Sequence, residues 1–154
     1  MKDKIEIIHF SDELKKHIKT LNYEWLEKYF RIEPGDEYSL SNPRDAIIDK
    51  GGYIFYAKYD DEIVGTASLL KKSEDVFELG KMAVTDRVKG KGIGTILLEY
   101  CLDFAKEKGI PKLILYSNTR LTSALHLYKK YGFTETPLES GLYERADIKL
   151  EKVL

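Results

Sequence analysis

Apolar residues recur along the chain at the three- and four-residue spacing of amphipathic helices. The most regular stripe ends at Gly109 and Pro111 and consists of Ile93, Ile96, Leu97, Tyr100, Cys101, Phe104 and Ala105. An earlier stripe follows Ser11, a residue suited to cap a helix, and consists of Leu14, Ile18, Leu21, Trp25 and Tyr29. A later one ends at Gly132 and consists of Leu121, Ala124, Leu127, Tyr128 and Tyr131. The spacing predicts three helices, each with one buried face.

Short β-branched, aromatic or alternating runs predict six to seven strands around these helices. The runs are residues 5–10, 53–59, 63–70, 76–84, 113–116, 133–136 and 143–150. Short connections among the early runs favour antiparallel pairing, with a hairpin turn at 60–62. Gly80, inside the run 76–84, predicts a bulge or a close backbone approach.

Two breaks separate the first helix from the second strand. Residues 33–36, which include Pro34 and Gly35, are expected to end the helical pattern. A short helix is expected after Asn42 as its cap, and the pair of glycines at 51–52 is expected to end it.

The strand 79–84, the helix that follows it and the strand 113–116 have the order of a right-handed βαβ unit. Combined with the antiparallel strands before it, this unit predicts a mixed α/β fold with a mostly antiparallel central sheet and one parallel pair. No repeat, low-complexity tract or linker interrupts the sequence, so residues 1–154 are expected to form a single domain.

Composition narrows the range of partners. With 25 Lys and Arg against 26 Asp and Glu, the formal net charge of -1 provides no global field for nucleic acid. A single cysteine, Cys101, excludes an intramolecular disulfide, and because His9, His17 and His126 lack metal-ligand spacing we expect no metal. The sequence shows neither the apolar core of a signal peptide nor a membrane-length apolar run, so a soluble, cytoplasmic protein is expected. The sequence is compatible with a homodimer and does not decide the oligomeric state.

The stretch Arg87–Thr95 has the composition of an anion site. Gly90, Gly92 and Gly94 let the backbone approach a ligand closely, and their amide groups lie where a helix begins. Arg87, Lys89 and Lys91 add positive charge. The stretch therefore predicts a phosphate or pyrophosphate cradle, against the alternative of a basic connector that only starts a helix.

Two nucleotide motifs fit this loop poorly. A P-loop needs Gly-Lys-Ser/Thr after a four-residue gap, and Gly94-Thr95 lacks the lysine. A dinucleotide fingerprint that begins at Gly90 needs a third glycine where Thr95 stands. ATP and NAD remain as minor alternatives.

The spacing Arg-x-x-Gly-x-Gly, formed by Arg87, Gly90 and Gly92, resembles the GNAT superfamily of acyl-CoA-dependent N-acetyltransferases. The strand 78–84, Asn118 after the next strand, and the segment 124–133 that ends in Gly-Phe add to this resemblance. Together they extend over roughly residues 78–135. The resemblance implies acetyl-CoA as co-substrate, helices on both faces of the sheet, and a parallel strand pair that splays apart at the cofactor site.

The resemblance also implies roles for individual residues. The CoA pyrophosphate would lie on the loop amides, and the pantetheine arm would pair with the edge of the strand before the loop. The residues implied in cofactor binding are Met82, Ala83, Val84, Arg87, Val88, Lys89, Gly90, Lys91, Gly92, Ile93, Gly94, Thr95, Asn118 and Tyr128. An amide near Met82 would stabilise the oxyanion of the tetrahedral intermediate. Asn118 would bond the pantetheine amide, unless it only shapes a turn.

Two side chains match catalytic positions of the family. Tyr128 matches the general acid that protonates the leaving thiolate, although its place on an apolar helix face is also typical of core packing. Glu78 matches the position of a general base found in some members, against the alternative of a solvated residue at the start of a strand. Cys101 lies on a buried stripe and is expected to be a small core residue, which favours direct transfer in a ternary complex.

The acceptor pocket is expected between the first two helices and the C-terminal strands. Asn22, Trp25 and Tyr29 share one helical face, and Tyr143 is expected on the opposite side. The resulting hypothesis is acetyl transfer to a primary amine of a small molecule, a peptide N-terminus or a lysine. The alternative is a non-catalytic acyl-CoA sensor or binding module.

Overall fold

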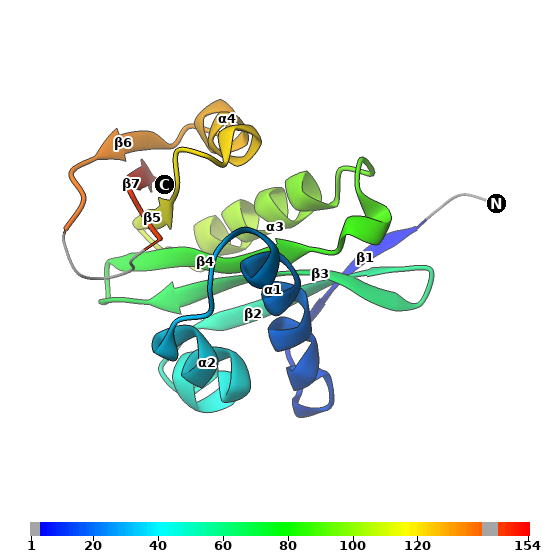
Figure 1. Ribbon diagram of the computed structural model, residues 1–154. Helices are drawn as coiled ribbons and strands as arrows, with labels where there is room; N and C mark the ends of the chain where they lie inside the picture. The colour runs from blue at the N-terminus through cyan, green and yellow to red at the C-terminus, as the bar shows by residue number, and fades with distance from the viewer. Residues whose placement is uncertain (1–3, 140–144) are drawn as a thin grey trace.

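The computed structural model describes residues 4–139 and 145–154, which fold around a seven-stranded sheet (Figure 1). The strands are β1 (Ile5–His9), β2 (Tyr53–Tyr59), β3 (Glu62–Lys71), β4 (Val76–Val84), β5 (Lys112–Ser117), β6 (Thr134–Thr136) and β7 (Ile148–Val153). Their order across the sheet is β1-β2-β3-β4-β5-β7-β6. Every described strand pair is antiparallel except β4–β5, which confirms the predicted mixed α/β fold.

Helices cover both faces of this sheet (Figure 1). They are α1 (Lys15–Tyr29), α2 (Pro34–Ser41), α3 (Ile93–Glu107) and α4 (Thr122–Lys130), with short turns at Asp12–Leu14, Arg44–Ile48 and Asp86–Val88. On one face, Ile18 and Leu26 of α1 and Leu40 of α2 pack against Tyr56. On the other face, the apolar stripe of α3 joins the side chains of β3 and β5 in a larger cluster. The helical stripes of the sequence therefore pack as their spacing predicts.

The segment between α1 and β2 differs from its prediction. Residues 33–36 do not end regular structure but begin α2, because Glu33 and Asp36 form a reciprocal capping box around Pro34. Glu is an uncommon N-cap, so few residues in the sequence indicate this helix. The helix expected after Asn42 is reduced to a single π-helical turn.

The last strand also begins later than predicted, at Ile148 instead of residue 143. Tyr143 itself lies outside the described residues. In the described approach to β7, the Arg145 carbonyl accepts a hydrogen bond from Asn118 at 2.7 Å, and the Asp147 carboxylate accepts two from Thr119 at 2.8 Å. These bonds hold residues 145–147 against the β5–α4 loop instead of in the sheet.

The parallel pair separates after a short contact, as the family resemblance implies. β4 pairs with β5 only from Val76 to Glu78, so the rest of β4 has no described partner on that side. On the opposite side Ala67 of β3 faces both Lys81 and Met82, and Lys81 adopts a φ of 51°. This bulge follows Gly80, where a Cβ would lie 3.0 Å from Leu70. The end of β4 is therefore bent away from β5 and its backbone groups face a gap.

Candidate active site

A cavity of about 340 Å³ lies where β4 and β5 separate. Its walls come from α1, α2, β4, β5, α4 and the approach to β7. The residues that line it include Asn22, Trp25, Tyr29, Phe30, Asp36, Glu78, Lys81, Met82, Ala83, Val84, Tyr116, Asn118, Tyr128 and Arg145. The cavity thus brings together both predicted catalytic residues, the predicted strand edge and three of the four predicted acceptor residues. Tyr143, the fourth, lies outside the described residues.

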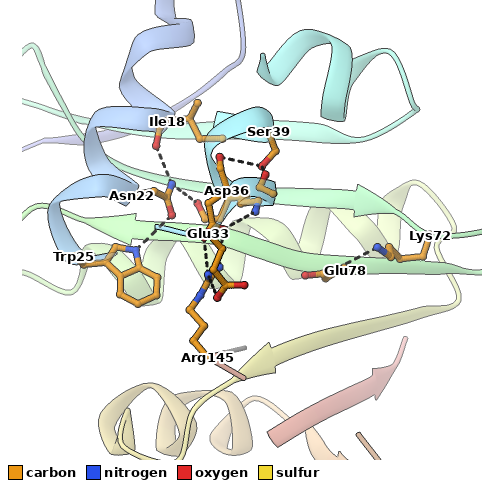
Figure 2. Close-up of polar contacts among 11 residues, drawn as sticks. Ile18, Asn22, Trp25, Glu33, Asp36, Ser39, Lys72, Glu78 and Arg145 are labelled. Atoms are coloured by element: carbon orange, nitrogen blue, oxygen red, sulfur yellow. Dashed lines mark hydrogen bonds and ion pairs between the residues drawn. The ribbon is translucent and has the colours of Figure 1, made fainter. Parts of the chain in front are cut away.

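Asn22 fixes the bulge of β4 from the side of α1. Its buried amide donates to the carbonyl of Ile18 at 2.9 Å and to the carbonyl of Lys81 at 3.1 Å, as Figure 2 shows in part. The indole of Trp25 donates to the Asn22 oxygen at 3.4 Å. Because Asn22 is 2% exposed and fully engaged, it shapes the cavity wall and holds the strained backbone of Lys81 in place.

Glu78 is buried at the start of the cavity, with an exposed fraction of 4%, and is not the solvated surface residue that a strand start usually carries. One carboxylate oxygen lies 3.5 Å from the Lys72 ammonium, which approaches from the solvent side (Figure 2). A buried carboxylate with a cation at one side and a cavity at the other is placed to accept a proton from a bound molecule.

An ionic network occupies the same end of the cavity. Asp36, which is 2% exposed, accepts two hydrogen bonds from the Arg145 guanidinium at 2.6 and 2.8 Å and lies 3.5 Å from the Lys81 ammonium. Arg145 also donates to Glu33 at 3.0 Å. Burial by itself would raise the pKa of Asp36. Hydrogen bonds from Arg145 and the Glu33 amide, together with the positive charges of Arg145 and Lys81, hold this pKa below its usual value. Asp36 is therefore a carboxylate at neutral pH.

Burial lowers the pKa of Lys81, and the carboxylate of Asp36 opposes that change. Lys81, Asp36 and Arg145 were not predicted as site residues. No short motif marks them, because they come from the strand bulge, the second helix and the approach to the last strand, and they meet only in the folded chain.

Tyr128 faces the cavity from α4. Its ring packs edge-on against Phe133 with 5.9 Å between centroids. Burial raises its pKa to about 12, so the hydroxyl keeps its proton at neutral pH. Cys101 lies on the buried stripe of α3, where burial raises the pKa of its thiol far above the usual value. It is therefore a core residue and a poor nucleophile.

The loop before α3 has the backbone of an anion cradle. Gly90 and Gly92 have φ values of 86° and 75°, and no described heavy atom comes within 4 Å of a Cβ built on either. Gly92 is the N-cap of α3, and the first intrahelical bond runs from the Ile96 amide to the Gly92 carbonyl at 3.1 Å. The amides of residues 93–95 therefore have no partner within the helix and are available to a ligand.

The basic side chains of this loop lie to its sides. The Arg87 guanidinium pairs with Glu62 at 3.4 Å, and the Lys91 ammonium lies 5.3 Å from the centre of the Tyr59 ring. From α1, Glu24 accepts hydrogen bonds from the Thr85 hydroxyl and the Asp86 amide, both at 2.9 Å. Glu24 of α1 thus anchors the start of the loop.

The side chain of Asn118, directly after β5, forms hydrogen bonds with neighbouring backbone. Its amide nitrogen donates to the Arg145 carbonyl at 2.7 Å, and its oxygen accepts from the Arg120 amide at 2.9 Å. The Asn118 side chain therefore links the loop that follows β5 to the segment that precedes β7. The turn-shaping role of Asn118 fits these bonds, and its amide nitrogen carries a second N–H that can donate to another group.

The described residues contain neither a metal-site cluster nor a helix suited to span a membrane. In ranges 4–139 and 145–154, no cluster of three or more His, Cys, Asp or Glu side chains has the arrangement of a metal site. None of the helices in those ranges combines the length and the apolar character that crossing a membrane requires.

The sequence and the fold both match known acetyltransferases. The pattern of the Acetyltransferase (GNAT) family matches residues 19–133, which is more than half of the chain. Streptothricin acetyltransferase from Streptomyces lavendulae is 39% identical over 56 residues, covering 36% of this chain and 30% of that protein. The N-acetyltransferase YvbK of Bacillus subtilis is 27% identical over 126 residues, covering 75% of this chain and 81% of YvbK.

The chain spans less than half the length of several curated relatives that it matches, streptothricin acetyltransferase among them. Among solved structures, a GNAT acetyltransferase from Staphylococcus aureus Mu50 superposes with a TM-score of 0.85 at 22% identity, over 97% of this chain and 99% of its own. A GNAT acetyltransferase from Elizabethkingia anophelis with acetyl-CoA bound gives 0.76 at 26% identity, over 99% and 100%. With a family match over most of its length and this fold around the cavity, the chain belongs to the GNAT family of acetyltransferases.

Proposed function

We propose that this protein is an N-acetyltransferase that moves an acetyl group from acetyl-CoA to a primary amine by direct transfer in a ternary complex. The observation that carries the proposal is the presence of three features: the glycine cradle at the start of α3, the part of β4 that extends beyond its pairing with β5, and Tyr128 in the cavity wall. Solved GNAT relatives contain acetyl-CoA or CoA. Their ligands support the same donor here.

The donor fits the residues that are present. The pyrophosphate needs several convergent amides without side chains in the way, which the amides around Gly92 supply. The pantetheine arm is an extended chain with amide groups, and it would pair with the backbone of Met82–Val84. The thioester at the end of that arm would then lie at the bulge of β4, where an amide near Met82 would stabilise the oxyanion.

Two side chains would move protons. Glu78 would take a proton from the acceptor ammonium, directly or through water, because its buried carboxylate lines the acceptor end of the cavity. The neutral amine then attacks the thioester carbon, the C–S bond breaks, and Tyr128 would give its proton to the leaving thiolate. The proton that the new amide nitrogen loses would restore the Tyr128 hydroxyl, directly or through water. The raised pKa of Tyr128, about 12, keeps that proton in place before transfer.

A non-catalytic acyl-CoA sensor would use the same cradle without turnover. The buried Glu78 and the cavity-facing Tyr128 favour the enzyme, since binding of CoA alone requires neither.

Thermal unfolding in the presence of candidate donors tests the identity of the ligand. Acetyl-CoA and CoA are expected to raise the midpoint by several degrees at saturation, because a ligand that binds only the native state stabilises it by mass action. ATP and NAD are expected to leave the midpoint unchanged. A shift with ATP or NAD equal to that with CoA would contradict the donor assignment.

A further inference from the structure

Arg145 bridges the two sides of the cavity. It approaches from the segment before β7 and extends to the first turn of α2, where it contacts Asp36 and Glu33 (Figure 2). The guanidinium is 18% exposed and its partners are 2% and 14% exposed. Because this is a bidentate contact among buried charges, separating the two segments would remove two hydrogen bonds from Asp36 and leave it with Lys81 as its nearby cation.

A second arginine makes a parallel bridge. Arg120, in the loop after β5, donates to the carbonyl of Tyr29 at 3.3 Å, and its guanidinium lies 4.6 Å from the centre of the Phe30 ring. Asn118 couples both bridges, because it bonds the Arg120 amide and the Arg145 carbonyl. The end of α1 and the start of α2 are therefore tied at two points to the loops around β5 and β7.

The space beneath these bridges is limited. The cavity of about 340 Å³ is near the lower end of the range of roughly 300–1,000 Å³ that is common for small-ligand pockets. It would have to hold the reacting end of the donor together with the acceptor. Its acceptor end is lined by the rings of Trp25, Phe30 and Tyr116 and by the carboxylate of Glu78, surfaces that suit a compact amine.

We propose that the acceptor is a small free amine enclosed by the cavity, and that the Arg145–Asp36 bridge excludes amines carried on a polypeptide. This inference rests on the proposed acetyltransferase function. A polypeptide acceptor would need a groove between the start of α2 and the approach to β7, and the bridge joins those two segments across the cavity wall. The cavity then selects its acceptor by the size of the molecule as well as by its reactive amino group.

Thiol release from acetyl-CoA, measured with matched acceptors, tests this inference. One set of acceptors consists of free primary amines with alkyl or aromatic chains. The other consists of peptides that carry a primary amine, either on an internal lysine side chain or on an N-terminal glycine. The best free amine is expected to exceed every peptide in kcat/KM by about 100-fold, within the range that a shaped pocket can discriminate. A peptide acetylated as efficiently as the best free amine would overturn the inference and leave the transferase function standing.

The variant Arg145→Gln tests the bridge itself. Asp36 keeps Lys81 at 3.5 Å as a compensating cation, and the ratio of peptide to free-amine kcat/KM is expected to rise by about 10-fold. Arg44→Gln removes an exposed Arg–Asp pair of 2.7 Å whose members are not part of the cavity lining, and it is expected to leave the ratio unchanged. An unchanged ratio in a folded Arg145→Gln overturns the role of the bridge. If that variant does not fold, the wild-type series decides alone, and absence of thiol release with every amine overturns the transferase function itself.

Discussion

Replacing Tyr128 by Phe is expected to lower kcat by about 10²- to 10⁴-fold, the range typical of the loss of a positioned general acid. The ring and its packing against Phe133 are retained, so the affinity for acetyl-CoA is expected to stay within about threefold, less than 1 kcal/mol. Steady-state thiol release gives kcat, and calorimetric titration gives the affinity. A variant with wild-type kcat would show that another group protonates the thiolate.

Tyr131→Phe is the matched control for this experiment. Tyr131 follows the same helix, but its hydroxyl donates to Glu99 at 2.5 Å and is not part of the cavity lining. Loss of that exposed hydrogen bond is expected to change kcat less than twofold, since exposed pairs contribute little. A similar loss of kcat in both variants would point to damage of α4 instead of loss of an acid.

The pH dependence of kcat follows from the raised pKa of Tyr128. Only the protonated hydroxyl donates, and protonation persists below its pKa of about 12. The expected profile therefore has no falling limb from Tyr128 until the pH approaches that value.

Replacing Gly92 by Ala is expected to weaken acetyl-CoA binding by about 10- to 100-fold, equal to the loss of one hydrogen bond to a charged group. The added methyl would lie at the N-cap of α3, in space that no described atom occupies and that the pyrophosphate would need. Titration calorimetry with CoA measures the effect.

Gly109→Ala controls for backbone strain in that experiment. Gly109 has a φ of 74°, against 75° for Gly92, and a Cβ there also has no described neighbour within 4 Å. Both variants are expected to lose about 1 kcal/mol of unfolding free energy from the left-handed conformation. Only Gly92→Ala is expected to lose CoA affinity. Equal affinities in the two variants would contradict the cradle.

The sequence predicted those parts of the fold that depend on local periodicity. The stripe of α3 and the largely apolar runs of β2 to β4 identify their elements. The helix buries one face, and the strands lie in a sheet that is covered on both faces. The start of α2 was missed because its capping box uses Glu33, an uncommon cap, beside a Pro-Gly pair that is more typical of a turn.

The donor side of the site was also accessible from sequence, since the glycines, the helix start and Tyr128 lie within short, regular spacings. The acceptor side was accessible only in part. Trp25 and Tyr29 share a helical face, but Asp36, Lys81 and Arg145 meet through a strand bulge and a long-range ion pair. Such contacts depend on tertiary geometry and leave no local pattern.

The most direct test of acetyl transfer follows the acetyl group itself. The protein is mixed with acetyl-CoA and a set of small primary amines, and mass spectrometry is applied to the amines, to the free CoA and to the intact protein. Direct transfer predicts an acetylated amine and free CoA in equal amounts, with the mass of the protein unchanged. Acetyl-CoA that stays intact, or an acetyl group that accumulates on the protein, would contradict it.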